Sequence, residues 1–231
     1  GDESSVKYLL KAIRDADWVF LGPGSWFTSV MPHVLVPSLR DAIVSTKARR
    51  LLNLNLEVHT GETKGYRAQD HIDSLVKHAP ELRFDIVLAS LHDHARQDAD
   101  RLTARSLQAI RHPLVNVLCH PANRLVGHSD GYALDFEALY AAAAEAGTAL
   151  EVDGAPSHID LEGERARAAA QAGVTLSIDS DCHRVQALSR QMGFGVGTAR
   201  RGWVEARHVL NTRPVAAVRE FIAAKRRGAR P

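Results

Sequence analysis

The run Asp85-Ile86-Val87-Leu88-Ala89 lies near the middle of the 231-residue chain and has the apolar, β-branched composition of a buried strand. Similar runs occur on both sides of it, and their starts are roughly 25 to 35 residues apart, the length of one strand–helix unit. They are Trp18–Leu21, Leu51–Leu54, Val115–Leu118, Ala149–Val152 and Val174–Ile178. This spacing predicts an α/β fold built of consecutive βα units.

The segments between these runs have helical periodicity. Ile72, Leu75 and Val76 fall on one helix face, and the segment containing Phe136 and Leu139 behaves in the same way. Alternating strands and helices indicate a parallel sheet. We expect a barrel-like arrangement, complete or incompletely closed, and keep an open Rossmann-like sheet as the alternative.

Composition excludes several classes of protein. The chain is 45% hydrophobic with a formal net charge of +2, so nothing in the overall balance favours nucleic acid or a membrane surface as partner. Neither a signal peptide nor a membrane-length apolar run is evident, and the two cysteines, Cys119 and Cys182, are far apart in the sequence. These features predict a cytoplasmic protein with reduced thiols.

Polar residues follow the predicted strands, where parallel α/β folds bind their ligands. His92, His120, Asp181 and His183 follow three of the later strands. Imidazole and carboxylate groups together suit Zn²⁺, Mn²⁺ or Fe, and a metal ion there would activate a bound water molecule. The sequence thus predicts a site for a single metal ion, formed by these four side chains.

The C-terminal part also resembles a known family. Its segments Ala89–His92, Cys119–Arg124, Leu150–Gly154, Ile178–His183 and Thr198–Trp203 are similar to the PHP domain of bacterial family X DNA polymerases, from about residue 85 to the end. The resemblance implies a metal-binding β/α barrel with phosphodiester-cleaving, exonuclease-type activity. It places His92, His120, Asp181 and His183 at metal-ligand positions and Arg124 at a basic position near the site, where we expect it to bind phosphate. The family's opening His-x-His pair, a further His and a bridging Glu have no counterpart before His92.

A glycine-rich turn, Gly22-Pro23-Gly24-Ser25, follows the first predicted strand. Such turns allow backbone N–H groups to approach an anion closely. With the following Trp26–His33, Asn53-Leu54-Asn55, Gly61-Glu62-Thr63 and Asp70-His71, it resembles the 2-phospho-L-lactate transferase-like family, and in particular its bacterial gluconeogenesis-factor branch, over about residues 12 to 84. The resemblance implies a Rossmann-like fold with phosphate bound by Gly22, Gly24, Ser25 and Thr28, and a pocket lined by Asn55. The family's N-terminal nucleotide-binding turn has no counterpart here.

Both families contain a strand of the form Asp-x-Val-Leu-Ala, so Asp85–Ala89 suits either one. We interpret the chain as an engineered chimera in which a Rossmann-like fragment, residues 1–84, merges with a PHP half-barrel fragment, residues 85–231. The expected function is a scaffold without native catalysis. Residual metal-dependent phosphoesterase activity and phosphate, sulfate or nucleotide binding at the Gly22–Ser25 turn are the alternatives. An unclosed sheet would also expose an edge strand, which favours a homodimer or a domain-exchanged dimer.

Overall fold

The computed structural model of the chain describes residues 3–56, 63, 66–91 and 98–228. These residues form one six-stranded parallel sheet in the order β1-β2-β3-β4-β5-β6. The strands are β1 (Trp18–Leu21), β2 (Arg49–Asn55), β3 (Ile86–Ser90), β4 (Val117–Cys119), β5 (Ala149–Asp153) and β6 (Leu176–Asp179). The prediction of consecutive βα units is therefore confirmed.

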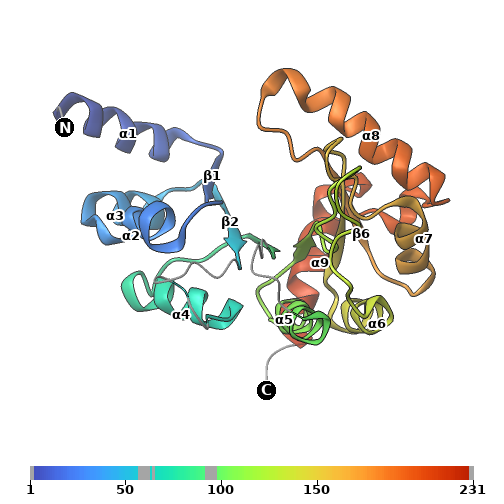
Figure 1. Cartoon of the computed structure of the whole chain (residues 1–231). Helices are drawn as coiled ribbons and strands as arrows, with labels where there is room; N and C mark the ends of the chain where they lie inside the picture. The colour runs from blue at the N-terminus through green and yellow to red at the C-terminus, as the bar shows by residue number, and fades with distance from the viewer. Residues whose placement is uncertain (1–2, 57–62, 64–65, 92–97, 229–231) are drawn as a thin grey trace.

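Helices precede β1, connect each strand to the next, and follow β6. They are α1 (Glu3–Asp15), α2 (Pro32–Leu35), α3 (Pro37–Ser45), α4 (Ala68–His78), α5 (Ala99–Arg111), α6 (Phe136–Ala146), α7 (Gly163–Gln171), α8 (Leu188–Arg201) and α9 (Val215–Gly228), with a π-helical turn η1 (Trp26–Val30) and 3₁₀ turns η2 (Val185–Ala187), η3 (Ala206–His208) and η4 (Leu210–Thr212). Figure 1 shows α1 to α4 around the β1–β2 end of the sheet and α7 and α8 around the β6 end.

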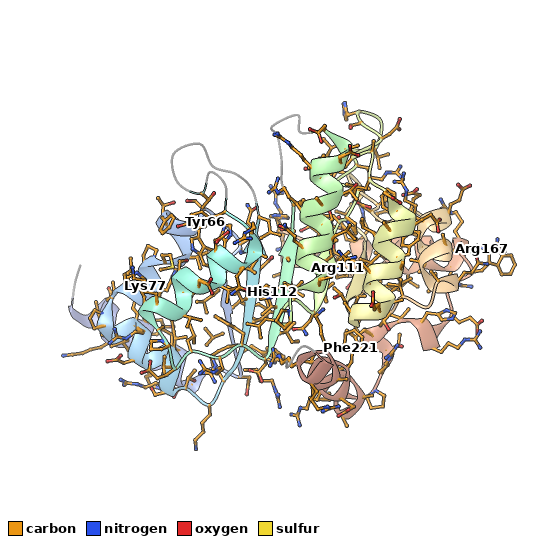
Figure 2. The ribbon with its side chains drawn as sticks, turned by 90° about the horizontal axis from the view of Figure 1, so that it is seen from below. Tyr66, Lys77, Arg111, His112, Arg167 and Phe221 are labelled. Atoms are coloured by element: carbon orange, nitrogen blue, oxygen red, sulfur yellow. The ribbon has the colours of Figure 1, made fainter. Side chains whose placement is uncertain are left out.

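The main core lies on one face of the sheet. Because the strands follow one another in order and crossovers of this kind are right-handed, the connecting helices collect on one side. Figure 2 shows α4, α5 and α6 in this layer. Alternate strand residues point into it, among them Leu52, Val87, Leu118 and Leu150, all at most 1% exposed.

The opposite face is covered only in part by the described residues. Val117, Cys119 and Ala149 form a second, smaller core there, against which Val218 and Phe221 of α9 pack. Farther along the same face, near the free edge, Trp18 and Phe20 of β1 are 43% and 63% exposed. The helix α9 thus covers the middle of this face and leaves its β1 side open to solvent.

Of the two predicted forms of the sheet, the structure has the open one. The barrel-like closure that we favoured does not form, since β1 and β6 are the two edges of the described sheet and are not neighbours. The outer edge of β6 is occupied instead: Asn211 accepts a hydrogen bond from the Ile178 N–H (3.1 Å) and donates one to the Ile178 carbonyl (2.6 Å). An edge whose backbone groups are already paired has little to gain from a further strand.

Among the described residues, no helix is both long and apolar enough to cross a membrane.

Candidate functional site

The ends of β4, β5 and β6 bring together the polar side chains of the C-terminal part. Glu151 and Asp153 alternate with the buried Leu150 and Val152 along β5, so both carboxyl groups point away from the main core. Asp179 of β6 is directly opposite Asp153 in the strand register. On the β4 side, the His120 N–H donates a hydrogen bond of 2.6 Å to Glu151 Oε2. The result is a buried acidic cluster at the carboxyl edge of the sheet.

Burial controls the ionisation of this cluster. Desolvation, followed by the neighbouring Asp179 carboxylate, raises the pKa of Glu151 well above its usual value. Desolvation also raises the pKa of Asp179, and it raises that of Asp153 to about 8. The pKa of the Cys119 thiol is raised by burial and by Glu151, so this thiol is protonated and unreactive near neutral pH. The cluster therefore retains protons that exposed carboxyl groups would release.

A second buried carboxyl group lies beside this cluster. Asp160 is 0% exposed, and burial raises its pKa to about 7, although the backbone amides of Asn123 and Arg124 oppose that shift. The Arg124 guanidinium lies 3.5 Å from the Glu162 carboxylate. The cation that the sequence predicts to bind phosphate thus already has an internal partner.

Three of the four predicted metal ligands lie in the described residues and follow the expected strands, but they differ in their surroundings. His120 is buried after β4, whereas Asp181 and His183 are exposed after β6. His183 Nδ1 lies 3.1 Å from the Asp181 carbonyl oxygen. His92 lies outside the described residues, as do Gly61 and Glu62. Within the described ranges, no three His, Cys, Asp or Glu side chains are grouped so that they could hold a metal ion.

The predicted phosphate-binding turn lies at the end of β1. Gly22 has φ +84° and Gly24 has φ +140°, and a Cβ atom on Gly22 would lie 2.4 Å from the Asn53 carbonyl oxygen. Only glycine fits such a position. The π-helical turn begins after Ser25, whose carbonyl accepts hydrogen bonds from the N–H groups of Ser29 and Val30. The Thr28 side chain is exposed. Asn55 ends β2, the neighbouring strand, at the same edge.

The turn and the acidic cluster are separate features. Strands β2 and β3 lie between β1 and β4. At about 4.8 Å for each strand spacing, the turn is roughly 14 Å or more from the nearest residues of the cluster. A small ligand could not contact both the turn and the acidic cluster, so these are two independent candidate sites.

Sequence reasoning missed several residues of the acidic cluster as site residues. Glu151 and Asp153 stand two positions apart in a strand, and this period places them on one face. Two carboxyl groups on one face of a buried strand were thus a signal that could have been read. Asp160 gave no such signal, because it lies in an irregular segment whose burial depends on tertiary packing.

Comparison with known proteins accounts for both halves of the sequence. The model of the family "2-phospho-L-lactate transferase CofD" matches residues 2–120. The chain belongs to this family. Its relatives include a putative gluconeogenesis factor of Mycobacterium tuberculosis, 44% identical over 48% of this chain and 33% of that protein. The family match begins before residue 12 and extends past Asp85 through β4, farther in both directions than the resemblance we described.

A relative of a different kind matches another part of the chain, which overlaps the first in some residues. The DNA polymerase/3'-5' exonuclease PolX of Bacillus subtilis is 37% identical over 60% of this chain and 24% of that protein. The two-family composition is therefore confirmed. Because the shares matched by these two relatives together exceed the whole chain, some residues match both. The chain spans only about a quarter to a third of the length of these relatives.

A solved structure of a Bacillus halodurans protein is also similar. The two sequences are 37% identical, and the match covers 42% of this chain and 30% of the solved chain. The TM-score is 0.35.

Proposed function

We propose that the chain is an engineered α/β scaffold in which fragments of two families share one sheet, and that it lacks the catalytic activity of either family. The observation that carries this proposal is the continuity of the sheet: β2 pairs with β3 through five residue pairs, from Leu51–Ile86 to Asn55–Ser90, across the predicted junction. A scaffold requires a continuous sheet across the junction. Catalysis requires in addition that several reactive side chains point to one place, where a substrate can bind.

Phosphodiester cleavage of the PHP type needs ligands that hold metal ions and stabilise both the attacking and the leaving oxygen. The described residues do not fit this requirement. Arg124 is paired with Glu162, and no three His, Cys, Asp or Glu side chains of the described residues are grouped so that they could hold a metal ion. We therefore derive no reaction step through a metal ion for this chain.

A direct test uses bis(p-nitrophenyl) phosphate with the purified chain in Mn²⁺ or Zn²⁺. The proposal predicts no release of nitrophenol above that of the His120→Ala variant. Metal-dependent turnover by the parent chain that His120→Ala abolishes would overturn it. The Asp15→Ala variant, altered at an exposed position of α1, controls for general effects of a substitution, because it should behave as the parent does in either case.

Metal-dependent phosphoester hydrolysis is the second candidate. It is supported by the placement of His120, Glu151 and Asp179 at neighbouring strand ends, where acidic groups would favour a cation. It predicts stoichiometric Zn, Mn or Fe in elemental analysis of the parent chain, with the metal lost in Asp181→Ala and retained in Asp15→Ala. Metal-free parent chain after dialysis against Zn²⁺ or Mn²⁺ would contradict it.

Anion binding at the Gly22–Ser25 turn is the third candidate, and the turn's two positive φ angles support it. Titration calorimetry with phosphate, sulfate and a nucleotide should then give saturable heat that Thr28→Val reduces. Ser45→Ala, which alters an exposed hydroxyl on α3, should leave that heat unchanged. Equal heats for all three proteins would exclude binding at the turn.

A further inference from the structure

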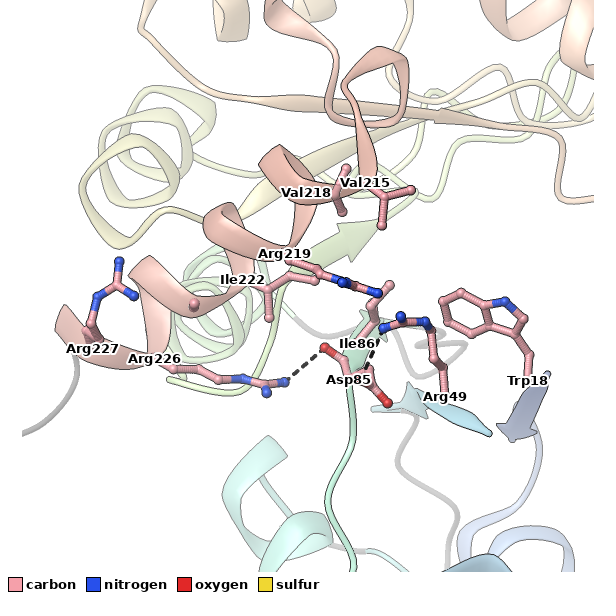
Figure 3. Close-up of a pocket in the computed structure, with 11 residues that line it drawn as sticks. Trp18, Arg49, Asp85, Ile86, Val215, Val218, Arg219, Ile222, Arg226 and Arg227 are labelled. Carbon is pink, nitrogen blue, oxygen red and sulfur yellow. Dashed lines mark hydrogen bonds and ion pairs between the residues drawn. The ribbon is translucent and has the colours of Figure 1, made fainter. Parts of the chain in front are cut away.

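A groove opens at the amino ends of the strands (Figure 3). The acidic cluster lies at the other end of the strands, at their carboxyl ends. Its volume is about 520 Å³. Trp18 and Arg49, which form the first residue pair of β1 and β2, line one wall together with Asp85 and Ile86 at the start of β3. Residues of α9 form the other wall. Cavities of about 300–1,000 Å³ are the usual size for small-molecule sites.

The floor of the groove is aliphatic. Ile86 of β3 faces Val218 and Ile222 of α9, and the Trp18 ring closes one end (Figure 3). Among the described residues, the charged side chains that line the groove are four arginines and one aspartate, Asp85. The same described lining contains no amide or hydroxyl side chain. An aliphatic ligand therefore suits this floor better than a nucleotide.

Positive charge collects at the mouth of the groove. Arg49 and Arg219 come from opposite walls and point toward one another (Figure 3). Arg49 lies 3.8 Å from Asp85 and 5.9 Å from the centre of the Trp18 ring. Arg219 is exposed, and it has no ion-pair partner among the described residues. Two guanidinium groups that face each other repel unless an anion lies between them, and a single aspartate balances only one.

A third arginine strengthens the positive field from below. Arg226 donates hydrogen bonds to the carbonyl oxygens of Phe84 (2.8 Å) and Asp85 (3.1 Å), which fixes its guanidinium at the start of β3. Its buried Nε has no hydrogen-bond partner within the part of the chain that the structure describes. The guanidinium is thus held in place by neutral acceptors, and its charge is not cancelled by them.

We propose that this groove binds the anion of a medium-chain fatty acid. Arg49 and Arg219 hold the carboxylate between them, because the planar guanidinium matches a carboxylate through two parallel hydrogen bonds. The alkyl chain lies along Ile86, Val218 and Ile222, where it leaves water for an apolar surface. Of the four arginines in the lining, Arg227 is paired with Glu220 and Arg49 with Asp85, so Arg219 and Arg226 supply the positive charge that favours an anion over a neutral or cationic amphiphile.

Both parts of the chain are needed for this site. Trp18, Arg49 and Asp85 fall within the match to the CofD family, residues 2–120, whereas all of α9 lies outside it. The residues matched by the family model therefore supply one wall and not the other. The groove arises where the C-terminal helix packs beside the N-terminal strands.

The test is titration calorimetry of the full chain with octanoate, decanoate and dodecanoate below their micelle concentrations. We expect one saturable site whose affinity rises with chain length, by up to roughly fourfold for each methylene group. Arg219→Gln should weaken decanoate binding roughly tenfold, because it removes a charge-assisted hydrogen bond. Arg167→Gln alters an exposed arginine of α7 and should bind as the parent does. Ile222→Ser should reduce the chain-length dependence.

Four results would overturn the proposal. These are no saturable binding of decanoate by the parent chain, equal binding of decyltrimethylammonium, equal loss in Arg219→Gln and Arg167→Gln, and tighter binding of AMP than of decanoate. Self-association that is seen in the parent and lost in Arg219→Gln, without decanoate binding, would assign the groove to a second copy of the chain instead. Circular dichroism of each variant verifies folding; Arg219 is exposed, so its replacement leaves the packing of α9 intact.

Discussion

Asp160 illustrates how a single buried carboxyl group can tie the stability of the fold to pH. It is 0% exposed, and neither of its carboxylate oxygens has a hydrogen-bond partner of normal geometry among the described residues. Its pKa of about 7 in the folded chain lies above the value of 3.8 that is usual for an exposed aspartate. Between these values the folded state retains a proton that the unfolded state has released, so the free energy of unfolding falls as pH rises.

Asp160→Asn should remove the contribution of Asp160 to this dependence and leave those of Asp153, Asp179 and Glu151. The variant is expected to lose less stability than the parent between pH 5 and about pH 8, because the amide carries no charge to desolvate. Urea unfolding at several pH values measures the difference. Asp15→Asn, at an exposed position, should keep the slope of the parent. Parallel curves for the parent and Asp160→Asn would show that another group controls the pH dependence.

Gly22 and Gly173 provide a matched pair for the Gly-Pro-Gly turn. Their φ angles are +84° and +85°, but only Gly22 has a backbone oxygen within 2.4 Å of the Cβ position, while Gly173 has no atom within 4 Å. Gly173→Ala should cost about 1–2 kcal/mol of unfolding free energy, the usual penalty of left-handed backbone for alanine. Gly22→Ala should cost about 1–3 kcal/mol more. Equal losses in chemical denaturation would contradict the close contact with Asn53.

At the residue scale, sequence reasoning identified positions better than environments. It correctly placed His120 and Asp181 after strands, and it recognised the glycine turn. It could not see that Arg124 pairs with Glu162 or that Asp160 is buried, because both facts depend on how distant segments pack. Ion pairing and desolvation are tertiary properties without a local pattern.

At the scale of elements, the edge of β6 is terminated by a side chain. Asn211 hydrogen-bonds both backbone groups of Ile178, and a parallel bridge joins Leu176 to Val209. Asn211→Leu should leave both Ile178 groups without these partners and cost about 1–3 kcal/mol. Hydrogen exchange of the Ile178 amide is then expected to accelerate more than that of Val152 in β5. Unchanged exchange at Ile178 would show that the Asn211 contact is dispensable.

Strand and helix positions were largely predictable, with instructive exceptions at their ends. β4 was expected over Val115–Leu118 and forms over Val117–Cys119. Asn116 uses its side-chain oxygen to accept the Val87 N–H at 3.0 Å, a contact that no strand propensity encodes. The π-helical turn Trp26–Val30 was likewise not foreseen. Its position depends on the burial of Trp26, whose Nε1 donates to Ser74 Oγ at 2.7 Å.

At the scale of the whole molecule, the two sequence fragments share one main core, whose buried residues run from Leu21 to Val209. Contacts across the predicted junction reinforce it: His112 Nε2 lies 2.7 Å from Gln69 Oε1, joining α4 to the end of α5 (Figure 2). The choice between barrel and open sheet could not be made from sequence, because consecutive βα units fit both. The Asn211 contact at β6, a tertiary feature, accompanies the open form.

This shared core predicts a single cooperative unfolding transition. In a Trp18→Phe, Trp203→Phe variant, fluorescence reports only on Trp26, which is 2% exposed in the N-terminal part. Its urea midpoint should coincide with the midpoint from far-ultraviolet circular dichroism, which averages over all helices. Separate midpoints would mean that the fragments unfold independently, despite the continuous sheet.

The unequal edges of the sheet also limit how copies of this chain can add to one another. At the β6 edge, Asn211 pairs both backbone groups of Ile178 and a bridge joins Leu176 to Val209, whereas β1 is unpaired on its outer side within the described sheet. Edge-to-edge growth needs two open edges on every copy if it is to continue. A copy with one open edge can pair with only one other copy. Once β1 pairs with β1 of a second copy, neither copy has an open edge left, so association by this route stops at a dimer.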